Sequence, residues 1–174
     1  NFDTVRGGVD VASTDRATDG ATNLAGFLNG LDAASQKDDP HLTALGHSYG
    51  SLTTGLALQE PGGAPVDDVV FYGSPGVEAS SEADLGLEPG HVYAMEADDD
   101  RFVPEMGKTG RFGPDPSVIF PNLSVSDGVS PDGVHRDAAH GHSEYARPDA
   151  EGNSRMSGYN LAVVVAGLPD LVVR

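Results

Sequence analysis

The feature of this 174-residue chain that most restricts its fold is the pentapeptide G-H-S-Y-G at residues 46–50. It fits the pattern G-x-S-x-G, which is typical of a nucleophile elbow, a sharp turn from a strand into a helix that presents a serine at its tip. We expect glycine at both Gly46 and Gly50 because side chains there would collide with the neighbouring strand and helix. The pattern also arises by chance, so the surrounding sequence must support it.

The sequence on both sides of the pentapeptide supports an elbow. Residues 41–45 form a short apolar run suited to a buried strand, and residues 51–59 carry leucine and alanine at helical spacing. The run P-G-G at residues 61–63 predicts the end of that helix. Strand, turn and helix therefore follow one another in the order that an elbow requires. The alternative is a turn rich in glycine and serine that carries no chemistry.

The rest of the chain alternates between predicted strands and helices. Helical spacing predicts helices over residues 17–31, where Gly30 marks the end, and over about 154–167. Apolar runs predict strands over residues 66–72 and 91–97, with at most one short strand near 118–120 inside an irregular stretch over 107–141. This alternation favours an α/β fold, a three-layer sandwich with helices on both faces of a mostly parallel sheet.

The number of predicted strands is low for a fold of this class. Strands that precede the elbow are missing, and residues 1–16 are too polar to supply them. We therefore expect residues 1–174 to be the C-terminal portion of a single domain, from the helix before the elbow to the last helix. We also expect this portion to associate with an N-terminal segment that carries the first strands.

Composition restricts the partners. The formal net charge of −17 predicts repulsion from nucleic acid and from anionic membrane surfaces, although the acidic residues also fit a solvated surface. The chain has no cysteine, so disulfides and cysteine-ligated zinc are excluded. Its longest apolar run, residues 161–168, is far shorter than the roughly 20 residues that span a bilayer. None of these features indicates a compartment.

A serine nucleophile needs a histidine base and a carboxylate that orients the base. In enzymes with this elbow the acid follows the serine in the chain, at the end of a later strand. Asp98, Asp99 and Asp100 stand at that place. Asp100 is favoured because it begins the stretch D-R-F-V-P, which resembles the D-x-x-V-P stretch common after this strand in enzymes with the elbow. One of the three is expected to be buried, since burying all three like charges is too costly. The alternatives are a solvated acidic turn and a weak calcium site.

The base is expected in a late loop before the last helix. Three of the six histidines come too early in the chain: His41, His47 and His91. The late candidates are His135, His140 and His142, and we favour His142 because it is nearest the closing helix and follows a glycine in G-H-S-E-Y. An oxyanion hole requires two N–H donors, of which one is expected from Tyr49. The second is expected from a loop after an early strand that this chain lacks.

Three separated motifs carry a resemblance to a known family: G-H-S-Y-G-S at residues 46–51, F-Y-G-S-P-G at 71–76 and G-H-S-E-Y at 141–145. Over about residues 17–167 the chain resembles an actinobacterial family of α/β-hydrolases catalogued as DUF1023. The resemblance implies a serine hydrolase with Ser48 as nucleophile, Asp100 as acid and His142 as base. Family members usually carry an upstream segment with the first strands and a Pro-Gly-Thr-type loop.

The predicted activity is that of a carboxylesterase or lipase. The enzyme would cleave a small or lipid-like carboxylic ester through an acyl-enzyme, with no cofactor and no metal. An acyltransferase would use the same three side chains and pass the acyl group to an alcohol. A hydrolase-like binding module without catalysis is the second alternative.

Overall fold

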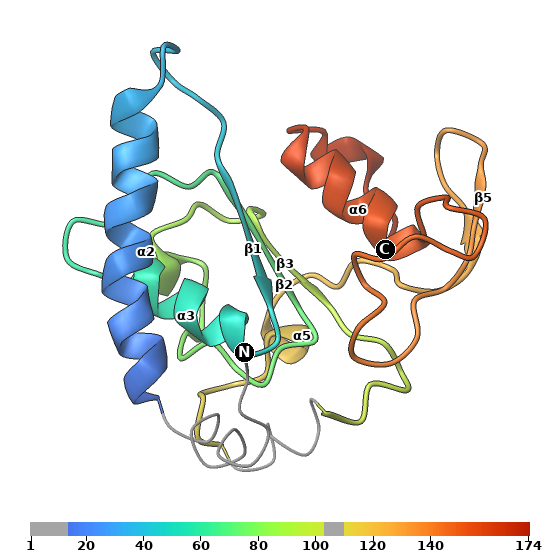
Figure 1. Cartoon of the computed structure of the whole chain (residues 1–174), viewed down its shortest axis with the longest axis horizontal. Coiled ribbons are helices and arrows are strands. Elements are labelled where there is room, and N and C mark those ends of the chain that lie inside the picture. The colour runs from blue at the N-terminus through green and yellow to red at the C-terminus, as the bar shows by residue number, and fades with distance from the viewer. Residues whose placement is uncertain (1–13, 103–109) are drawn as a thin grey trace.

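A three-stranded parallel sheet lies at the centre of the computed structural model, which describes residues 14–102 and 110–174 (Figure 1). Its strands, in spatial order, are β1 (Thr43–His47), β2 (Asp68–Tyr72) and β3 (Val92–Met95). Both pairs are parallel, with Leu45 opposite Val70 and Val70 opposite Tyr93. The carboxyl ends of the three strands therefore meet at one edge, the place where open α/β sheets hold their sites.

Apolar side chains of β2 point alternately to the two faces of the sheet, as the two-residue period of a strand requires. Val69 and Phe71 pack in the same cluster as Leu58 of α3 (Tyr49–Leu58). Val70 packs on the other face, in a cluster with Leu161 and Val164 of α6 (Met156–Val165). Figure 1 shows α3 and α6 on opposite sides of the sheet. These layers confirm the predicted α/β fold class.

Helix α2 (Asp15–Ala34) covers α3 from outside, through buried alanines at four-residue spacing that include Ala21 and Ala25. The expectation that this helix ends at Gly30 is wrong, because it continues to Ala34. A glycine inside a helix costs about 1 kcal/mol and does not by itself force a turn. In the part of the chain that the structure describes, no helix combines the length and apolarity needed to cross a membrane.

The expected strand at residues 118–120 is also wrong. These residues follow Asp115 and Pro116, and a short helix, α5 (Pro116–Ile119), forms there. The Asp115 carboxylate accepts a hydrogen bond from the backbone N–H of Ser117 at 2.8 Å, and proline is favoured in the first helical turn. The extended backbone comes later, where Leu123 donates its N–H to the carbonyl of Ala94 in β3 at 2.8 Å.

The remaining elements of the C-terminal half are short. An antiparallel pair that the sequence did not predict consists of β4 (Gly128–Val129) and β5 (His135–Arg136). The predicted helix at about 154–167 is confirmed as α6. Single 3-10 turns lie at Ala83–Leu85 and Pro169–Leu171. The segment between β5 and α6 has neither a helix nor a strand, and it returns the chain to the carboxyl edge of the central sheet.

Candidate active site

Ser48 lies between β1 and α3, at the tip of the predicted elbow. Its backbone has φ 55° and ψ −131°, one of two positive φ values at non-glycine residues in the described ranges. Such a conformation is strained for a residue with a side chain and persists only where the surroundings hold it. The N–H of Ser48 donates to the carbonyl of Tyr72 at 3.1 Å, so the neighbouring strand helps to hold the turn.

The two glycines of the pentapeptide differ in their surroundings. A Cβ on Gly46 would stand 2.9 Å from the Cα of Ser51 and 3.1 Å from Cδ1 of Phe71, as expected from an elbow. A Cβ on Gly50 would meet no described atom within 4 Å. The expectation that a side chain at Gly50 would collide with its neighbours is therefore wrong for residues 14–102 and 110–174, the part of the chain that the structure describes. Among the described residues, the turn is crowded at Gly46 and has no such neighbour at Gly50.

Ser48, His142 and Asp100 form one continuous chain of hydrogen bonds. Oγ of Ser48 lies 2.7 Å from Nε2 of His142, and Nδ1 of His142 lies 2.9 Å from Oδ2 of Asp100. A carboxylate accepts and does not donate, so the proton of the neutral ring is on Nδ1. Nε2 is then the acceptor for the Ser48 hydroxyl. This arrangement can remove a proton from a serine that attacks a carbonyl carbon.

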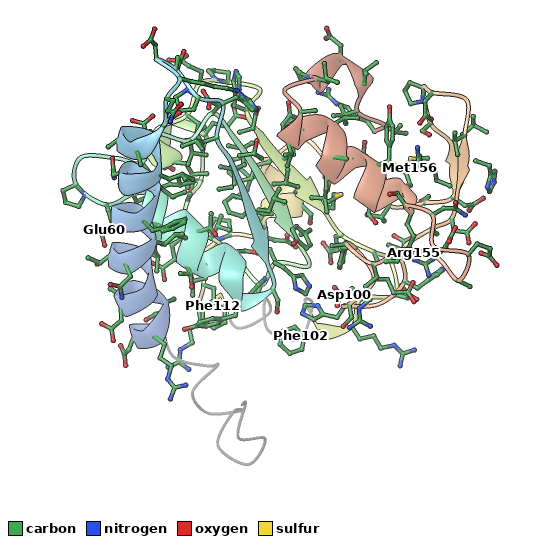
Figure 2. All side chains as sticks on the ribbon, turned by 45° about the horizontal axis from the view of Figure 1, so that its top comes forward. Glu60, Asp100, Phe102, Phe112, Arg155 and Met156 are labelled. Atoms are coloured by element: carbon green, nitrogen blue, oxygen red, sulfur yellow. The ribbon has the colours of Figure 1, made fainter. Side chains whose placement is uncertain are left out.

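Asp100 is buried, with 2% of its surface exposed, and its carboxylate has two further donors. The N–H of Phe102 donates to Oδ1 at 3.1 Å, and the hydroxyl of Tyr145 donates to Oδ2 at 2.9 Å. Figure 2 labels Asp100 and Phe102 near the end of β1. Burial raises the pKa of Tyr145, which keeps its hydroxyl protonated as a donor. The hydroxyl in turn accepts from the N–H of Ala97 at 2.9 Å.

Replacing Tyr145 with phenylalanine is expected to lower the free energy of unfolding by about 1–2 kcal/mol. The change removes a hydrogen bond to a buried carboxylate and leaves the N–H of Ala97 without its acceptor. Urea denaturation of the variant and the wild type measures the difference. Tyr159→Phe is the control, since the Tyr159 hydroxyl donates a partly buried hydrogen bond to the carbonyl of Leu171, which is itself exposed. Equal losses of unfolding free energy in the two variants would contradict a larger contribution from the buried hydrogen bonds of Tyr145.

The other two carboxylates of the aspartate run are exposed, as expected if only one is buried. Asp99 accepts from the N–H of Gly141 at 2.7 Å, and this hydrogen bond lowers the pKa of Asp99. Asp99 also lies 3.3 Å from Nδ1 of His140. His135 is exposed in β5, opposite Val129. Of the three late histidines, His142 is the one that contacts Ser48.

The early histidines lie at two different places. His41 and His91 bind Asp68 at the amino edge of the sheet, at 3.2 and 3.0 Å, away from the elbow. His47 lies inside the site, where its Nε2 donates to the carbonyl of His142 at 2.8 Å. The sequence offered no signal for this contact beyond the position of His47 next to Ser48.

Gly73 is a second residue of the site that sequence reasoning missed. It has φ 54°, and a Cβ there would meet Cε2 of Tyr145 at 3.1 Å, Oδ2 of Asp100 at 3.2 Å and Cε1 of His142 at 3.3 Å. The acid and the base therefore pack directly on the backbone that follows β2. The glycine within F-Y-G-S-P-G was a signal of such a close approach.

Tyr49, the expected oxyanion donor, is the first residue of α3. The first N–H groups of a helix point out of its N-terminus and make no bonds within the helix. The Tyr49 ring is oriented edge-on to Phe112 at 6.2 Å, and its hydroxyl accepts from the N–H of Ala17 at 3.1 Å. Burial raises the pKa of Tyr49. The side chain thus joins the elbow to α2, and the role of its N–H stays a prediction.

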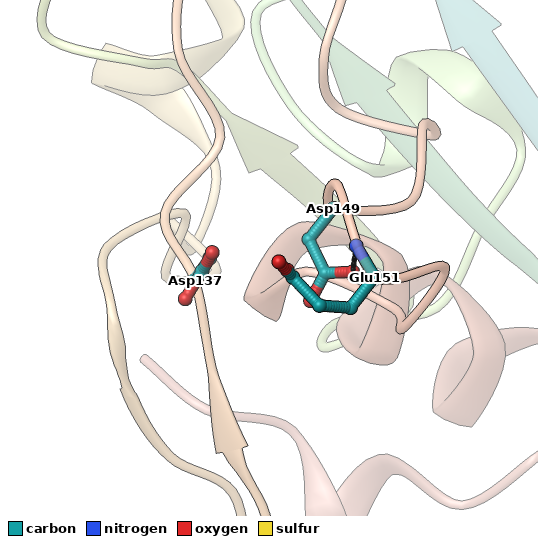
Figure 3. Close-up of side chains that lie close together, drawn as sticks. All are labelled: Asp137, Asp149 and Glu151. Carbon is teal, nitrogen blue, oxygen red and sulfur yellow. Dashed lines mark hydrogen bonds between the residues drawn. The ribbon is translucent and has the colours of Figure 1, made fainter.

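One group of three carboxylates lies close enough together to hold a cation, among the residues that the structure describes. It consists of Asp137, Asp149 and Glu151, whose oxygens lie within 4.8 Å of one another (Figure 3). Asp149 already accepts from the N–H of Asn153 at 2.7 Å, which lowers the pKa of Asp149. Exposed acidic groups commonly gather without an ion, and we assign no metal here.

Residues 3–107 match the model of a protein family described as alpha/beta hydrolase. The chain belongs to this family, which confirms the resemblance, and the motifs at residues 46–51 and 71–76 lie within the matched segment. The matched segment contains Ser48 and Asp100 and ends before His142. Family membership defines a class of protein, the α/β-hydrolases, and leaves the reaction of this member to be proposed.

Curated relatives extend the comparison. Over 132 residues the chain is 44% identical to two uncharacterized proteins, Mb0988c of Mycobacterium bovis and Rv0963c of Mycobacterium tuberculosis. The alignment covers 75% of this chain and 49% of each relative, so the chain spans about half the length of these relatives. A further uncharacterized protein of Mycobacterium tuberculosis, Rv2079, is 39% identical over 82 residues, which are 47% of this chain and 12% of that protein. No solved structure matches the chain.

Proposed function

We propose that this protein is a serine hydrolase that cleaves a carboxylic ester through an acyl-enzyme. The proposal assigns Ser48 as nucleophile, His142 as general base and acid, and Asp100 as the carboxylate that orients His142. The observation that carries it is the continuous chain of hydrogen bonds at 2.7 Å from Ser48 to His142 and 2.9 Å from His142 to Asp100. A serine is a weak nucleophile until a base takes its proton, and these contacts meet that requirement.

The first half of the proposed reaction acylates the serine. Oγ of Ser48 attacks the ester carbonyl carbon while Nε2 of His142 takes the hydroxyl proton. The imidazolium that forms keeps its Nδ1–H bond to the Asp100 carboxylate, and opposite charges at this distance stabilise it. When the tetrahedral intermediate collapses, the carbon–oxygen bond to the leaving alcohol breaks and His142 returns the proton to that oxygen. The alcohol departs and the acyl group remains on Ser48.

The second half releases the acid. A water molecule attacks the acyl carbon, His142 takes its proton, and the second tetrahedral intermediate expels Oγ of Ser48. His142 protonates Oγ as it leaves, which restores the starting state. In both halves negative charge develops on the former carbonyl oxygen. The N-terminus of α3, which begins at Tyr49 directly after the nucleophile, favours negative charge there and offers the Tyr49 N–H as one oxyanion donor.

The surroundings of His142 support an apolar group on the substrate. The Phe102 ring lies 4.5 Å from the His142 ring, centroid to centroid, and 39% of the residue is exposed. An alkyl or aryl part of an ester can pack on this ring beside the reacting bond, where water would otherwise lie. The net charge of −17 disfavours polyanionic partners such as nucleic acid. We therefore propose a small or lipid-like ester as the substrate class.

A fluorophosphonate probe tests the proposal, because it reacts with a serine that an adjacent base activates and not with ordinary serines. The protein is incubated with the probe, digested and analysed by mass spectrometry for the modified peptide. We expect modification at Ser48, none in Ser48→Ala, and strong suppression in His142→Gln. Ser51→Ala is the control that removes another serine near the elbow. It matches Ser48→Ala in position but not in surroundings, because Ser51 is buried and donates to the carbonyl of Gly46. A folded wild type that does not react would favour the alternative of a non-catalytic binding module.

Hydrolysis and acyl transfer share the acylation step and differ in what attacks the acyl-enzyme. p-Nitrophenyl esters of increasing chain length measure acylation through release of p-nitrophenol. Adding a primary alcohol and analysing the products separates the two outcomes. A hydrolase releases mainly the free acid, whereas an acyltransferase forms the new ester at low alcohol concentration.

A further inference from the structure

His47 joins the backbone of the proposed base to the end of β1. Its Nε2 lies 2.8 Å from the carbonyl oxygen of His142. A carbonyl oxygen only accepts hydrogen bonds, so Nε2 of His47 must carry a proton. The next residue, Ser48, contacts the side chain of the same histidine at 2.7 Å. Two consecutive residues of the elbow therefore hold the main chain and the ring of His142.

The loop that carries His142 is held by individual contacts, among them the hydrogen bonds of Ala139 to Val125 and of Tyr145 to Asp100. It lies between β5 and α6 and forms neither a helix nor a strand, so regular hydrogen bonding does not hold it in place. Its neighbour Gly141 is tied through its N–H to Asp99, a carboxylate that is exposed to solvent. At His142 itself, the backbone carbonyl accepts a hydrogen bond from Nε2 of His47. This partly buried hydrogen bond holds the main chain from which the His142 side chain extends. It therefore limits how far Nε2 of His142 can move from Oγ of Ser48.

The His47 ring is itself held by aromatic neighbours. It stacks on Tyr72 of β2, with ring centroids 5.0 Å apart and an interplanar angle of 16°. Tyr145 and His142 contact it at centroid distances of 6.0 and 4.9 Å. These contacts leave the imidazole little freedom to rotate away from the carbonyl. The His47 ring thus packs between Tyr72 of the sheet and the loop that carries His142 and Tyr145.

The same surroundings favour the neutral form of His47. Burial lowers the pKa of His47, and the nearby His142 acts in the same direction. The hydrogen bond to the His142 carbonyl and the Asp100 carboxylate act in the opposite direction and are outweighed. A neutral donor has a chemical advantage here. In the proposed reaction His142 becomes an imidazolium, and a second cation next to it would oppose that step.

We propose that His47 is a positioning residue, whose Nε2–H holds the backbone carbonyl of His142 so that the His142 ring stays in reach of Ser48. The inference rests on the proposed hydrolase function. It adds a residue that touches neither the substrate nor the reacting atoms and acts through the base. It also gives a reason for histidine at the second position of the pentapeptide.

Three substitutions separate this role from simple packing. His47→Gln places an amide N–H close to where Nε2 lies, and it cannot take a charge. His47→Asn has the same amide one methylene shorter, near the position of Nδ1, and cannot reach the carbonyl. His47→Leu fills similar space without a donor. We expect kcat for p-nitrophenyl ester hydrolysis to fall about 10- to 100-fold in the Asn and Leu variants, because small misplacements of a base are costly. His47→Gln should stay within about threefold of wild type, and KM should change little in all three.

The outcomes decide the proposal. Thermal melting is measured for all variants, and kcat is compared only among those that fold. Equal losses in the Gln and Asn variants would overturn the proposal, as would wild-type kcat in His47→Leu. A nitrogen-15 NMR spectrum of the imidazoles in the wild-type protein does not depend on activity. It should show His47 neutral with its proton on Nε2, and a proton on Nδ1 alone would also overturn the proposal. If the wild type neither reacts with the probe nor hydrolyses esters, the proposed function fails while this spectrum still tests the contact.

Discussion

Replacing Asp100 with asparagine is expected to lower kcat for ester hydrolysis by about 10⁴-fold, the size of the effect of the corresponding change in serine proteases. The carboxylate accepts the Nδ1–H of His142, which leaves Nε2 free to take the Ser48 proton. An asparagine amide can donate to Nδ1 and so favour the tautomer with the proton on Nε2. In that tautomer Nε2 cannot accept from Ser48. The nucleophile would then be present but not activated.

The surroundings of Asp100 make the change more severe. Oδ1 accepts from the N–H of Phe102, and Oδ2 accepts from the hydroxyl of Tyr145. Asparagine has a single oxygen, so in either orientation of its amide one of these two donors loses its acceptor. We therefore expect Asp100→Asn also to lose about 1–3 kcal/mol of folding stability, the cost of an unsatisfied buried polar group. Assays are run well below the melting temperature of the variant.

Asp99→Asn is the matched control, because the same chemical change falls on the adjacent, exposed residue. The asparagine oxygen can still accept from the N–H of Gly141, which Asp99 binds at 2.7 Å. We expect kcat of this variant to stay within about threefold of wild type. Steady-state hydrolysis of a p-nitrophenyl ester by the two variants and the wild type measures the difference. A large loss in Asp99→Asn with activity retained in Asp100→Asn would transfer the role of the acid to Asp99.

Replacing Gly55 with alanine is expected to lower the free energy of unfolding by about 3 kcal/mol, at the upper end of the usual cost of overpacking. Gly55 is buried in α3, and a Cβ there would stand 2.5 Å from the carbonyl oxygen of Val77 and 3.1 Å from its Cβ. The first of these is a backbone atom, which cannot turn away as the end of a flexible side chain can. The gain of about 1 kcal/mol in helix propensity does not offset such a collision.

Gly26→Ala is the control for this prediction, and it should have the opposite sign. Gly26 lies inside α2 on an exposed face, and a Cβ there meets no described atom within 4 Å. Propensity alone predicts a gain of about 0.5–1 kcal/mol. Urea denaturation followed by circular dichroism gives both values. A stabilised Gly55→Ala variant would contradict the close packing of α3 against the segment that carries Val77.

Local patterns were enough to predict most of the elements that position the site. The strand, turn and helix around Ser48, the two further parallel strands and the closing helix α6 all follow from runs of apolar residues and their spacing. Where a local signal was weak, the structure differs from the prediction. Gly30 does not end α2, and the apolar residues at 118–120 follow a helix-capping Asp115 and do not form a strand. The single domain over residues 1–174 stays a prediction.

The candidate site, like the fold, was predicted in part. The order of motifs along the chain selected Ser48, Asp100 and His142, and the structure brings these side chains into contact. Their catalytic roles rest on the proposal above. His47 comes too early in the chain to be the base. The contact of His47 with the His142 backbone depends on a loop that returns from 95 residues away, so no local pattern indicates it.

By itself, the sequence determined that a serine stands at a sharp turn between a strand and a helix, because glycine placement and apolar spacing are local properties. It also determined the order in which an acid and a histidine follow that serine. Only the tertiary structure decided which carboxylate is buried against His142, which glycine of the pentapeptide is crowded, and what His47 contacts. Each of these depends on atoms that are distant in the chain and close in space, and no local pattern of residues records such distances.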